Sequence, residues 1–112
     1  METKRVLMIK DHAAIQAATR ILKNRFPVAK VVLFGSKSRR DDDEESDIDI
    51  LVLTSRPLSW RERDAVTDAL YDVEMQYEVV ISTLIVPRDE WEQGVYSVMP
   101  IHDEIASEGI VL

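Results

Sequence analysis

The stretch LFGSKSRRDDDEESDIDILV, residues 33–52, joins two apolar segments through a polar one and decides the fold. After Lys30, residues 31–34 are apolar with two β-branched valines and no alternation, which predicts a buried strand over residues 30–34 that Gly35-Ser36 ends. The polar residues 36–46 predict a short turn or helical start followed by a loop. Residues 47–53 alternate at first and then become fully apolar, which predicts a second strand that enters the core from solvent.

Outward from this stretch, the chain alternates between helical and strand patterns. Ala14, Ala18 and Leu22 recur at helical spacing before Pro27, and Ser59 with Glu62 fits a capping box at a helix start. Helices are predicted over residues 5–25, 60–76, 87–93 and from 100 to about 109, and a third strand over residues 78–86. The order α-β-turn-β-α-β-α-α predicts a single domain over residues 1–112 of the α/β (α+β) class, a small mixed sheet flanked by helices.

The charge of the chain is concentrated in one segment. The 112 residues include 14 Lys and Arg against 21 Asp and Glu, a formal net charge of −7, and residues 41–49 hold seven acids and no base. The rest of the chain is therefore neutral and lacks a general basic footprint, so direct binding of nucleic acid is not expected. The 46% of hydrophobic residues is enough for a packed core, which excludes a wholly disordered chain.

Several other classes are excluded by what the sequence lacks. The absence of Cys excludes a disulfide framework, thiolate zinc sites and thiol catalysis. No apolar run reaches the length of a membrane span, and the N-terminus lacks the apolar core of a signal peptide. A cytoplasmic domain with no membrane contact is expected, and docking on a partner would stabilise a domain this small.

Two motifs in residues 33–52 can carry chemistry. Gly35 permits a sharp turn close to a ligand, and the Ser36 hydroxyl, the turn N–H groups and the cations Lys37, Arg39 and Arg40 could hold phosphate. Alternatively, this is a structural strand-to-turn connection. Asp47 and Asp49 lie on one face of a strand about 7 Å apart, which suits a hard divalent cation, although two solvated acids would look the same.

Rival motifs fail on their own residues. An EF-hand loop beginning at Asp41 would need Gly at position 46 and Glu at position 52, where the chain has Ser46 and Val52. A P-loop would need a second Gly followed by Lys after Gly35, and the chain has no such pair. Glu78, at the predicted start of the third strand, is a further candidate carboxylate if that strand lies beside residues 47–53, and otherwise a surface acid.

The combination of these residues resembles the signature of the minimal nucleotidyltransferases of the DNA polymerase β-like superfamily. That signature is an apolar strand, G-S, a variable residue, a small residue, R, and a D-x-D that begins the next strand. The matching positions are Gly35, Ser36, Ser38, Arg39, Ser46, Asp47 and Asp49. The resemblance extends over nearly the whole chain, with two departures: Arg40 replaces a frequent glycine, and the third acid is Glu instead of the commoner Asp.

The resemblance implies a polymerase β palm-like fold and a role for each matching residue. Gly35 and Ser36 would hold the β- and γ-phosphates of a nucleoside triphosphate, and Arg39 would contact phosphate or hold the loop. Asp47 and Asp49 would coordinate two Mg²⁺ ions. Glu78 would ligate the catalytic metal from the neighbouring strand and help the acceptor hydroxyl lose its proton.

The resemblance also implies a function and a partner. The expected activity is metal-dependent transfer of a nucleoside monophosphate, AMP from ATP, to a hydroxyl group on a partner protein. The expected partner is a HEPN-domain protein whose toxicity this chain would counter as antitoxin, in a homo- or hetero-oligomer. Two alternatives stay open: a weakly catalytic or non-catalytic nucleotide-binding module that neutralises a partner by docking, and a nucleotidyltransferase for a small molecule such as an aminoglycoside. Apolar residues of 95–112 could form the partner face or pack in the core.

Overall fold

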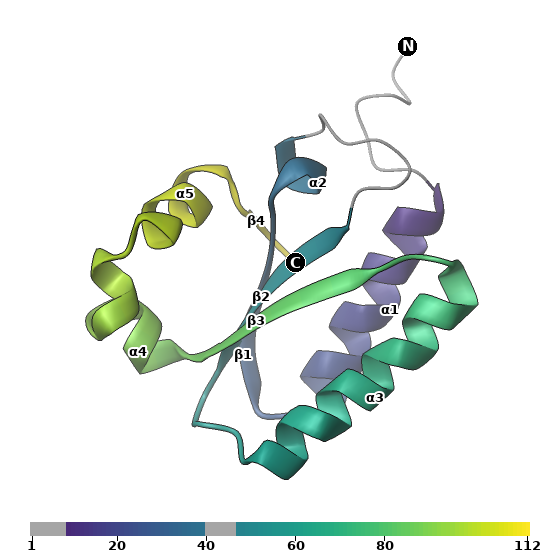
Figure 1. Cartoon of the computed structure of the whole chain (residues 1–112), viewed down its shortest axis with the longest axis horizontal. Coiled ribbons are helices and arrows are strands. Elements are labelled where there is room, and N and C mark those ends of the chain that lie inside the picture. The colour runs from purple at the N-terminus through teal and green to yellow at the C-terminus, as the bar shows by residue number, and fades with distance from the viewer. Residues whose placement is uncertain (1–8, 40–46) are drawn as a thin grey trace.

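The computed structural model describes residues 9–39 and 47–112 of the chain. In chain order the elements are α1 (Ile9–Arg25), β1 (Val28–Phe34), α2 (Ser36–Arg39), β2 (Ile48–Thr54), α3 (Trp60–Tyr77), β3 (Ile81–Pro87), α4 (Arg88–Gln93), the 3₁₀ helix η2 (Val95–Val98), α5 (Pro100–Glu108) and β4 (Ile110–Val111) (Figure 1).

The four strands of the described residues form one mixed sheet in the order β3-β2-β1-β4. β1 runs antiparallel to β2 and to β4, whereas β2 and β3 are parallel. A parallel pair needs a long crossover connection, and α3 supplies it between β2 and β3. The mixed sheet with flanking helices confirms the predicted fold class.

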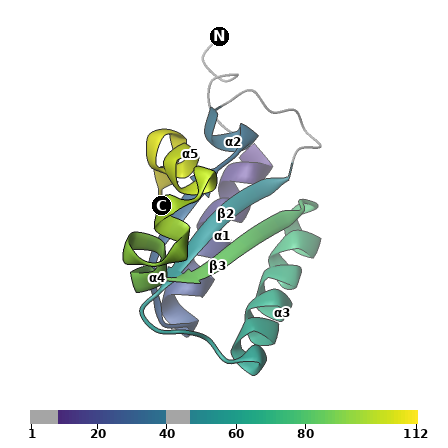
Figure 2. The same ribbon diagram turned by 60° about the vertical axis from the view of Figure 1, so that its left-hand side comes forward.

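Helices cover both faces of the sheet, and each face has its own apolar core. α1 and α3 pack on one face, and α4, η2 and α5 lie on the other (Figures 1 and 2). Alternate residues of β2 serve the two cores, because Ile48, Ile50 and Val52 pack with α1 and α3 while Leu51 and Leu53 pack with Trp91 and Ile105. None of the described helices combines the length and apolar composition needed to cross a membrane.

The third strand begins later than the sequence predicts. The sequence predicts this strand over residues 78–86, whereas β3 spans Ile81–Pro87. Glu78 is instead the C-cap of α3, with φ 57° and ψ 50°. Its N–H donates to the Glu74 carbonyl, so the chain is still leaving the helix at this residue. The prediction that Glu78 begins the strand is therefore wrong. The left-handed residue that ends a helix is usually glycine, so a glutamate at position 78 does not indicate in the sequence that the helix ends there.

Two short elements were not predicted, whereas the other boundaries agree closely. η2 and β4 have too few residues for a periodic pattern to show. The first four residues of the helix predicted over 5–25, and residues 40–46 of the predicted loop, lie outside the described residues.

The capping box predicted before α3 is present. The Ser59 hydroxyl accepts the Glu62 N–H at 3.1 Å, and the Glu62 carboxylate accepts the Ser59 N–H at 2.8 Å. The same carboxylate accepts hydrogen bonds from Nη1 and Nη2 of Arg56, at 3.0 and 2.7 Å. The hydrogen bonds from Arg56, then that from the Ser59 backbone, lower the pKa of Glu62 from its ordinary 4.5 to about 2.

Glu62→Gln should lower the free energy of unfolding at pH 7, because the neutral amide loses the ion pair with Arg56. A lowered pKa in the folded state gives a stability contribution that is present above the unfolded pKa. The difference between wild type and variant should therefore shrink as the pH falls from about 4.5 through 2. Urea unfolding across this range measures it. Glu104→Gln, the same change at an exposed position of α5, is the control; equal pH dependence in the two variants would contradict the assignment.

Candidate functional site

The Gly-Ser turn and the D-x-D strand meet at one end of the sheet. Phe34, the last residue of β1, pairs with Asp49 of β2, so Gly35 follows directly beside that aspartate. Gly35 has φ 76°, a left-handed conformation that L side chains rarely adopt. A Cβ placed on Gly35 would collide with the Asp49 carboxylate oxygen Oδ2. Both the backbone conformation and the contact therefore require glycine at this position.

Asp47 and Asp49 share the face of the sheet that carries α4 and α5. Asp47, immediately before β2, is exposed, and Asp49 is half-buried. Burial, and secondarily the charge of Asp47, raise the pKa of Asp49. A nearby cation would offset both effects, because it favours the ionised carboxylate. The two residues thus provide adjacent carboxylate oxygens of the kind that Mg²⁺ prefers.

α2 is the turn that follows Gly35. The Ser38 N–H and hydroxyl both donate to the Gly35 carbonyl, at 3.1 and 2.8 Å, which closes the turn on itself. Ser36 and Arg39 are the first and last residues of this short helix, and their predicted phosphate contacts stay predictions. Arg40 and residues 41–45 lie outside the described residues.

Lys37 does not act as the free cation that its place beside Gly35-Ser36 suggests. Its side chain is fully buried, and its Nζ lies 2.7 Å from Oδ2 of Asp11, whose side chain is 2% exposed. The prediction that Lys37 adds positive charge toward a ligand is therefore corrected, because its charge is matched inside the protein. The pair ties α2 to α1 across 26 residues of sequence.

The sequence contains a signal for the burial of Asp11, which the distribution of charges alone does not show. Asp11 precedes Ala14, Ala18 and Leu22 at spacings of three, seven and eleven residues, so it lies on the buried stripe of α1. An acid on such a stripe needs a buried partner, since an unpaired charge in a core is costly.

Glu78 is not placed with the two aspartates as the sequence predicts. It is an exposed C-cap residue, three positions before β3. Within residues 9–39 and 47–112 no group of three or more His, Cys, Asp or Glu side chains could hold a metal ion. A role for Glu78 in metal binding stays a prediction.

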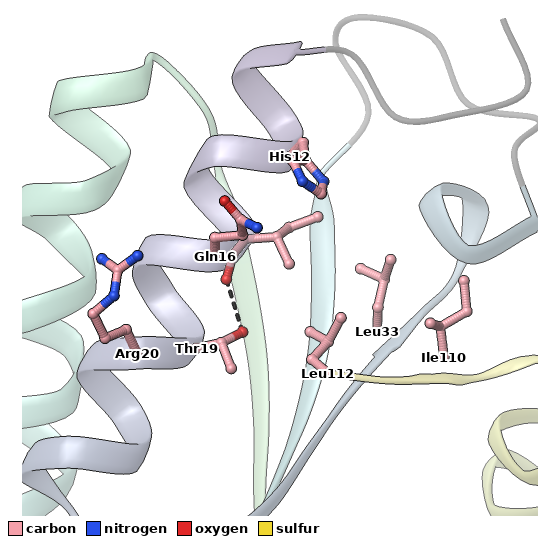
Figure 3. Close-up of a pocket in the computed structure, with 8 residues that line it drawn as sticks. His12, Gln16, Thr19, Arg20, Leu33, Ile110 and Leu112 are labelled. Carbon is pink, nitrogen blue, oxygen red and sulfur yellow. Dashed lines mark hydrogen bonds between the residues drawn. The ribbon is translucent and has the colours of Figure 1, made fainter. Parts of the chain in front are cut away.

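Pockets lie on both faces of the sheet. A pocket of about 540 Å³ opens beside α1 and is lined by His12, Ile15, Gln16, Thr19 and Arg20 together with Leu33, Ile110 and Leu112 (Figure 3). It lies on the α1 face, with no predicted site residue in its lining. A second cavity, of about 310 Å³, lies beneath α4 and α5, where Leu51 and Leu53 continue the face of Asp49. The α1 pocket is therefore separate from the candidate site.

Comparison with known proteins assigns the chain to a family. The family model described as Polymerase beta, Nucleotidyltransferase matches residues 16–92, which include the turn, the D-x-D strand and β3. This chain is a member of the polymerase beta nucleotidyltransferase family. The sequence signature in residues 33–52 and the family match thus agree, which confirms the resemblance.

Two curated relatives come from Methanocaldococcus jannaschii. One, named "Putative protein adenylyltransferase MJ0141", is 35% identical over 65 residues, which are 58% of this chain and 64% of that protein, so the match spans less than two thirds of its length. The other, named "Putative protein adenylyltransferase MJ0604", is 29% identical over 106 residues, 93% of this chain and 99% of that protein. Both names place the relatives among nucleotidyltransferases.

Two solved structures share the fold. A chain of the crystal structure of a mutant of the toxin–antitoxin MntA-HpeT matches with a TM-score of 0.56 and 18% identity, over 94% of this chain and 72% of that one. A chain of a crystal structure of the toxin–antitoxin with AMP-PNP matches with a TM-score of 0.58 and 18% identity, over 93% and 72%. At this identity the likeness concerns the fold alone.

Gly35→Ala in this member of the family should destabilise the fold and distort the site together. The left-handed backbone costs a non-glycine residue about 1–2 kcal/mol, and the methyl group displaces the Asp49 carboxylate. Urea unfolding measures the first effect. A double-mutant cycle with Asp49→Ala isolates the second, because the shorter side chain relieves the collision. Absence of any coupling between the two positions would show that the close approach does not exist.

Lys37→Met should cost about 3–5 kcal/mol of stability, because it leaves the Asp11 carboxylate buried without its ammonium partner. The double variant Lys37→Met with Asp11→Leu should recover most of this loss, since it leaves no uncompensated charge. Chemical unfolding of the two variants and the wild type measures both values. A cost below about 1 kcal/mol for Lys37→Met would mean that the ion pair does not hold α2 to α1.

Proposed function

We propose that this chain is a metal-dependent nucleotidyltransferase that transfers AMP from ATP to a hydroxyl group on a partner protein. The observation that carries the proposal is the contact between Gly35 and the Asp49 carboxylate, which brings a phosphate-binding turn against a cation-binding strand. The names of the two archaeal relatives support adenylyl transfer to protein, and the fold match to a structure with AMP-PNP supports an adenine nucleotide.

The residues of the site fit Mg²⁺ together with a triphosphate. Asp47 and Asp49 offer hard oxygen donors on one face, and these two residues would hold the cation. When bound, Mg²⁺ supplies charge neutralisation and polarises the phosphoryl oxygens. The sequence prediction of two ions with Glu78 as a third ligand is kept apart from this proposal, because Glu78 lies at the end of α3 and not in β3.

The protein itself would position the triphosphate and the acceptor. Gly35 lets the backbone approach the phosphates, and Ser36 and Arg39 would donate to their oxygens from α2. The Lys37–Asp11 pair and the Ser38 bonds to the Gly35 carbonyl hold that turn before the ligand arrives. Transfer of the α-phosphoryl group depends mainly on such positioning and on charge stabilisation.

The acceptor is proposed to be a HEPN-domain toxin, with this chain as its cytoplasmic antitoxin. Residues 1–112 would form a single minimal nucleotidyltransferase domain. A partner that docks as a folded protein would present its own hydroxyl. The match to chains of toxin–antitoxin structures supports a toxin as the partner, and the HEPN domain follows from the sequence resemblance.

A second candidate is a module that neutralises its partner by docking alone. Val95 and Val98 favour it, because their side chains are 66% and 83% exposed on η2, and Met99 beside them is 39% exposed. Such apolar exposure suits a contact surface. Catalysis and docking make different demands on Asp47 and Asp49, so one pair of variants separates the two candidates.

Wild-type protein incubated with α-labelled ATP, Mg²⁺ and its co-purified partner should label the partner. The double variant Asp47→Asn with Asp49→Asn should lose at least about 100-fold of the labelling rate, because the cation loses both carboxylates. Gel autoradiography of initial rates measures the effect. Asp64→Asn with Asp68→Asn changes the same charge on the exposed side of α3 and is the matched control.

The outcomes decide between enzyme and docking module. Equal labelling by wild type and the Asp47/Asp49 variant would overturn the enzymatic proposal, as would an unlabelled partner. Suppression of the partner's toxicity by that variant would support docking as sufficient for neutralisation.

A further inference from the structure

The residue that faces Asp49 from the neighbouring strand is a serine. β2 and β3 are parallel, and their register pairs Ile48 with Ile81 and Asp49 with Ser82. Residues paired across a sheet project their side chains to the same face, and neighbouring strands lie about 4.8 Å apart. Ser82 is therefore the β3 side chain beside the Asp49 carboxylate.

The cores on either side of the sheet confirm which way Ser82 faces. Ile48 and Ile81, one row before, both belong to the core against α1 and α3. Leu51 and Leu84, two rows after, both belong to the core against α4 and α5. Ser82 lies on the latter face, as Asp49 does, and it is exposed because β3 is an edge strand.

The backbone that leads into β3 is fixed in this register. The Ile48 N–H donates to the Val80 carbonyl at 2.9 Å, and the Ile81 N–H donates to Oε2 of Glu74 at 2.8 Å. Glu78 precedes both of these anchors, in the left-handed turn at the end of α3. Sliding β3 by four residues to bring Glu78 beside Asp49 would break both hydrogen bonds.

We infer that the cation site of this chain has two carboxylates and a serine hydroxyl, with Ser82 in the place beside Asp49 and Glu78 outside the site. Two carboxylates hold Mg²⁺ weakly unless substrate phosphates add further oxygens. The free protein therefore binds the cation weakly, and cation and nucleotide bind together. This inference rests on the proposed function, because it assigns Asp47 and Asp49 to cation binding.

Titration with Mn²⁺, followed by the electron paramagnetic resonance signal of the free ion, tests the inference without any turnover. Wild-type protein should bind Mn²⁺ weakly alone. With AMP-PNP present it should bind at least about tenfold more tightly, after the Mn²⁺ that AMP-PNP chelates in a titration without protein has been subtracted. Ser82→Asp should tighten binding to the free protein roughly tenfold, because it adds a third carboxylate beside Asp49.

Two control variants make the test specific. Thr83→Asp adds the same charge at the next residue, which pairs with Ile50 and faces the opposite side of the sheet, so Mn²⁺ affinity should not change. Glu78→Gln should also leave it unchanged. A tenfold loss in Glu78→Gln, or equal gains in Ser82→Asp and Thr83→Asp, would overturn the inference.

The result is distinguishable from the fate of the proposed function. Absence of labelling by wild type, with the Mn²⁺ pattern as expected, would reject the enzymatic role and leave the composition of the site standing. Labelling that depends on Asp47 and Asp49, with Mn²⁺ binding lost in Glu78→Gln, would reject the role of Ser82 and keep the enzyme.

Discussion

The antiparallel register between β1 and β2 is the constraint on which the site depends. It pairs Phe34 with Asp49 and so delivers Gly35 to the aspartate carboxylate. Side chains alternate along a strand, so a slip of one residue would turn Asp49 toward the core against α1 and α3 and move Ile48 and Ile50 out of it. Burying the Asp49 carboxylate among apolar side chains would be costly, which disfavours the slip. The cost of burying a carboxylate thus helps to fix the register on which the polar site depends.

Much of this arrangement could be predicted from the sequence, for physical reasons. The apolar runs on either side of Gly35-Ser36 specify two strands, and the Ser59–Glu62 capping box specifies where α3 begins. These signals are local, since each depends on residues within a few positions of one another. The alternation at the start of β2 likewise places Asp47 and Asp49 on one face before any tertiary contact is known.

What could not be predicted depends on contacts between distant residues or on unusual backbone. The partner of Lys37 is 26 residues away on α1, so the local sequence predicts that the Lys37 ammonium group binds a ligand. Only the structure shows that Lys37 and Asp11 are buried together. The left-handed conformation of Glu78 is set by the path from α3 into β3, and a glutamate there looks like the first residue of a strand. Ser82 carries no signal at all in the sequence, because its place beside Asp49 follows only from the register of β2 and β3.

The two halves of the site are anchored to different parts of the protein. The turn after Gly35 is tied to α1 through the Lys37–Asp11 ion pair. The start of β2 is tied to the residue before β3 by the hydrogen bond from the Ile48 N–H to the Val80 carbonyl. A molecule that binds both the turn and Asp49 would bridge these parts and act as a noncovalent cross-link between them. Its binding free energy would then add to the stability of the whole fold through mass action. For a domain with so small a core, the substrate would be part of what keeps it folded.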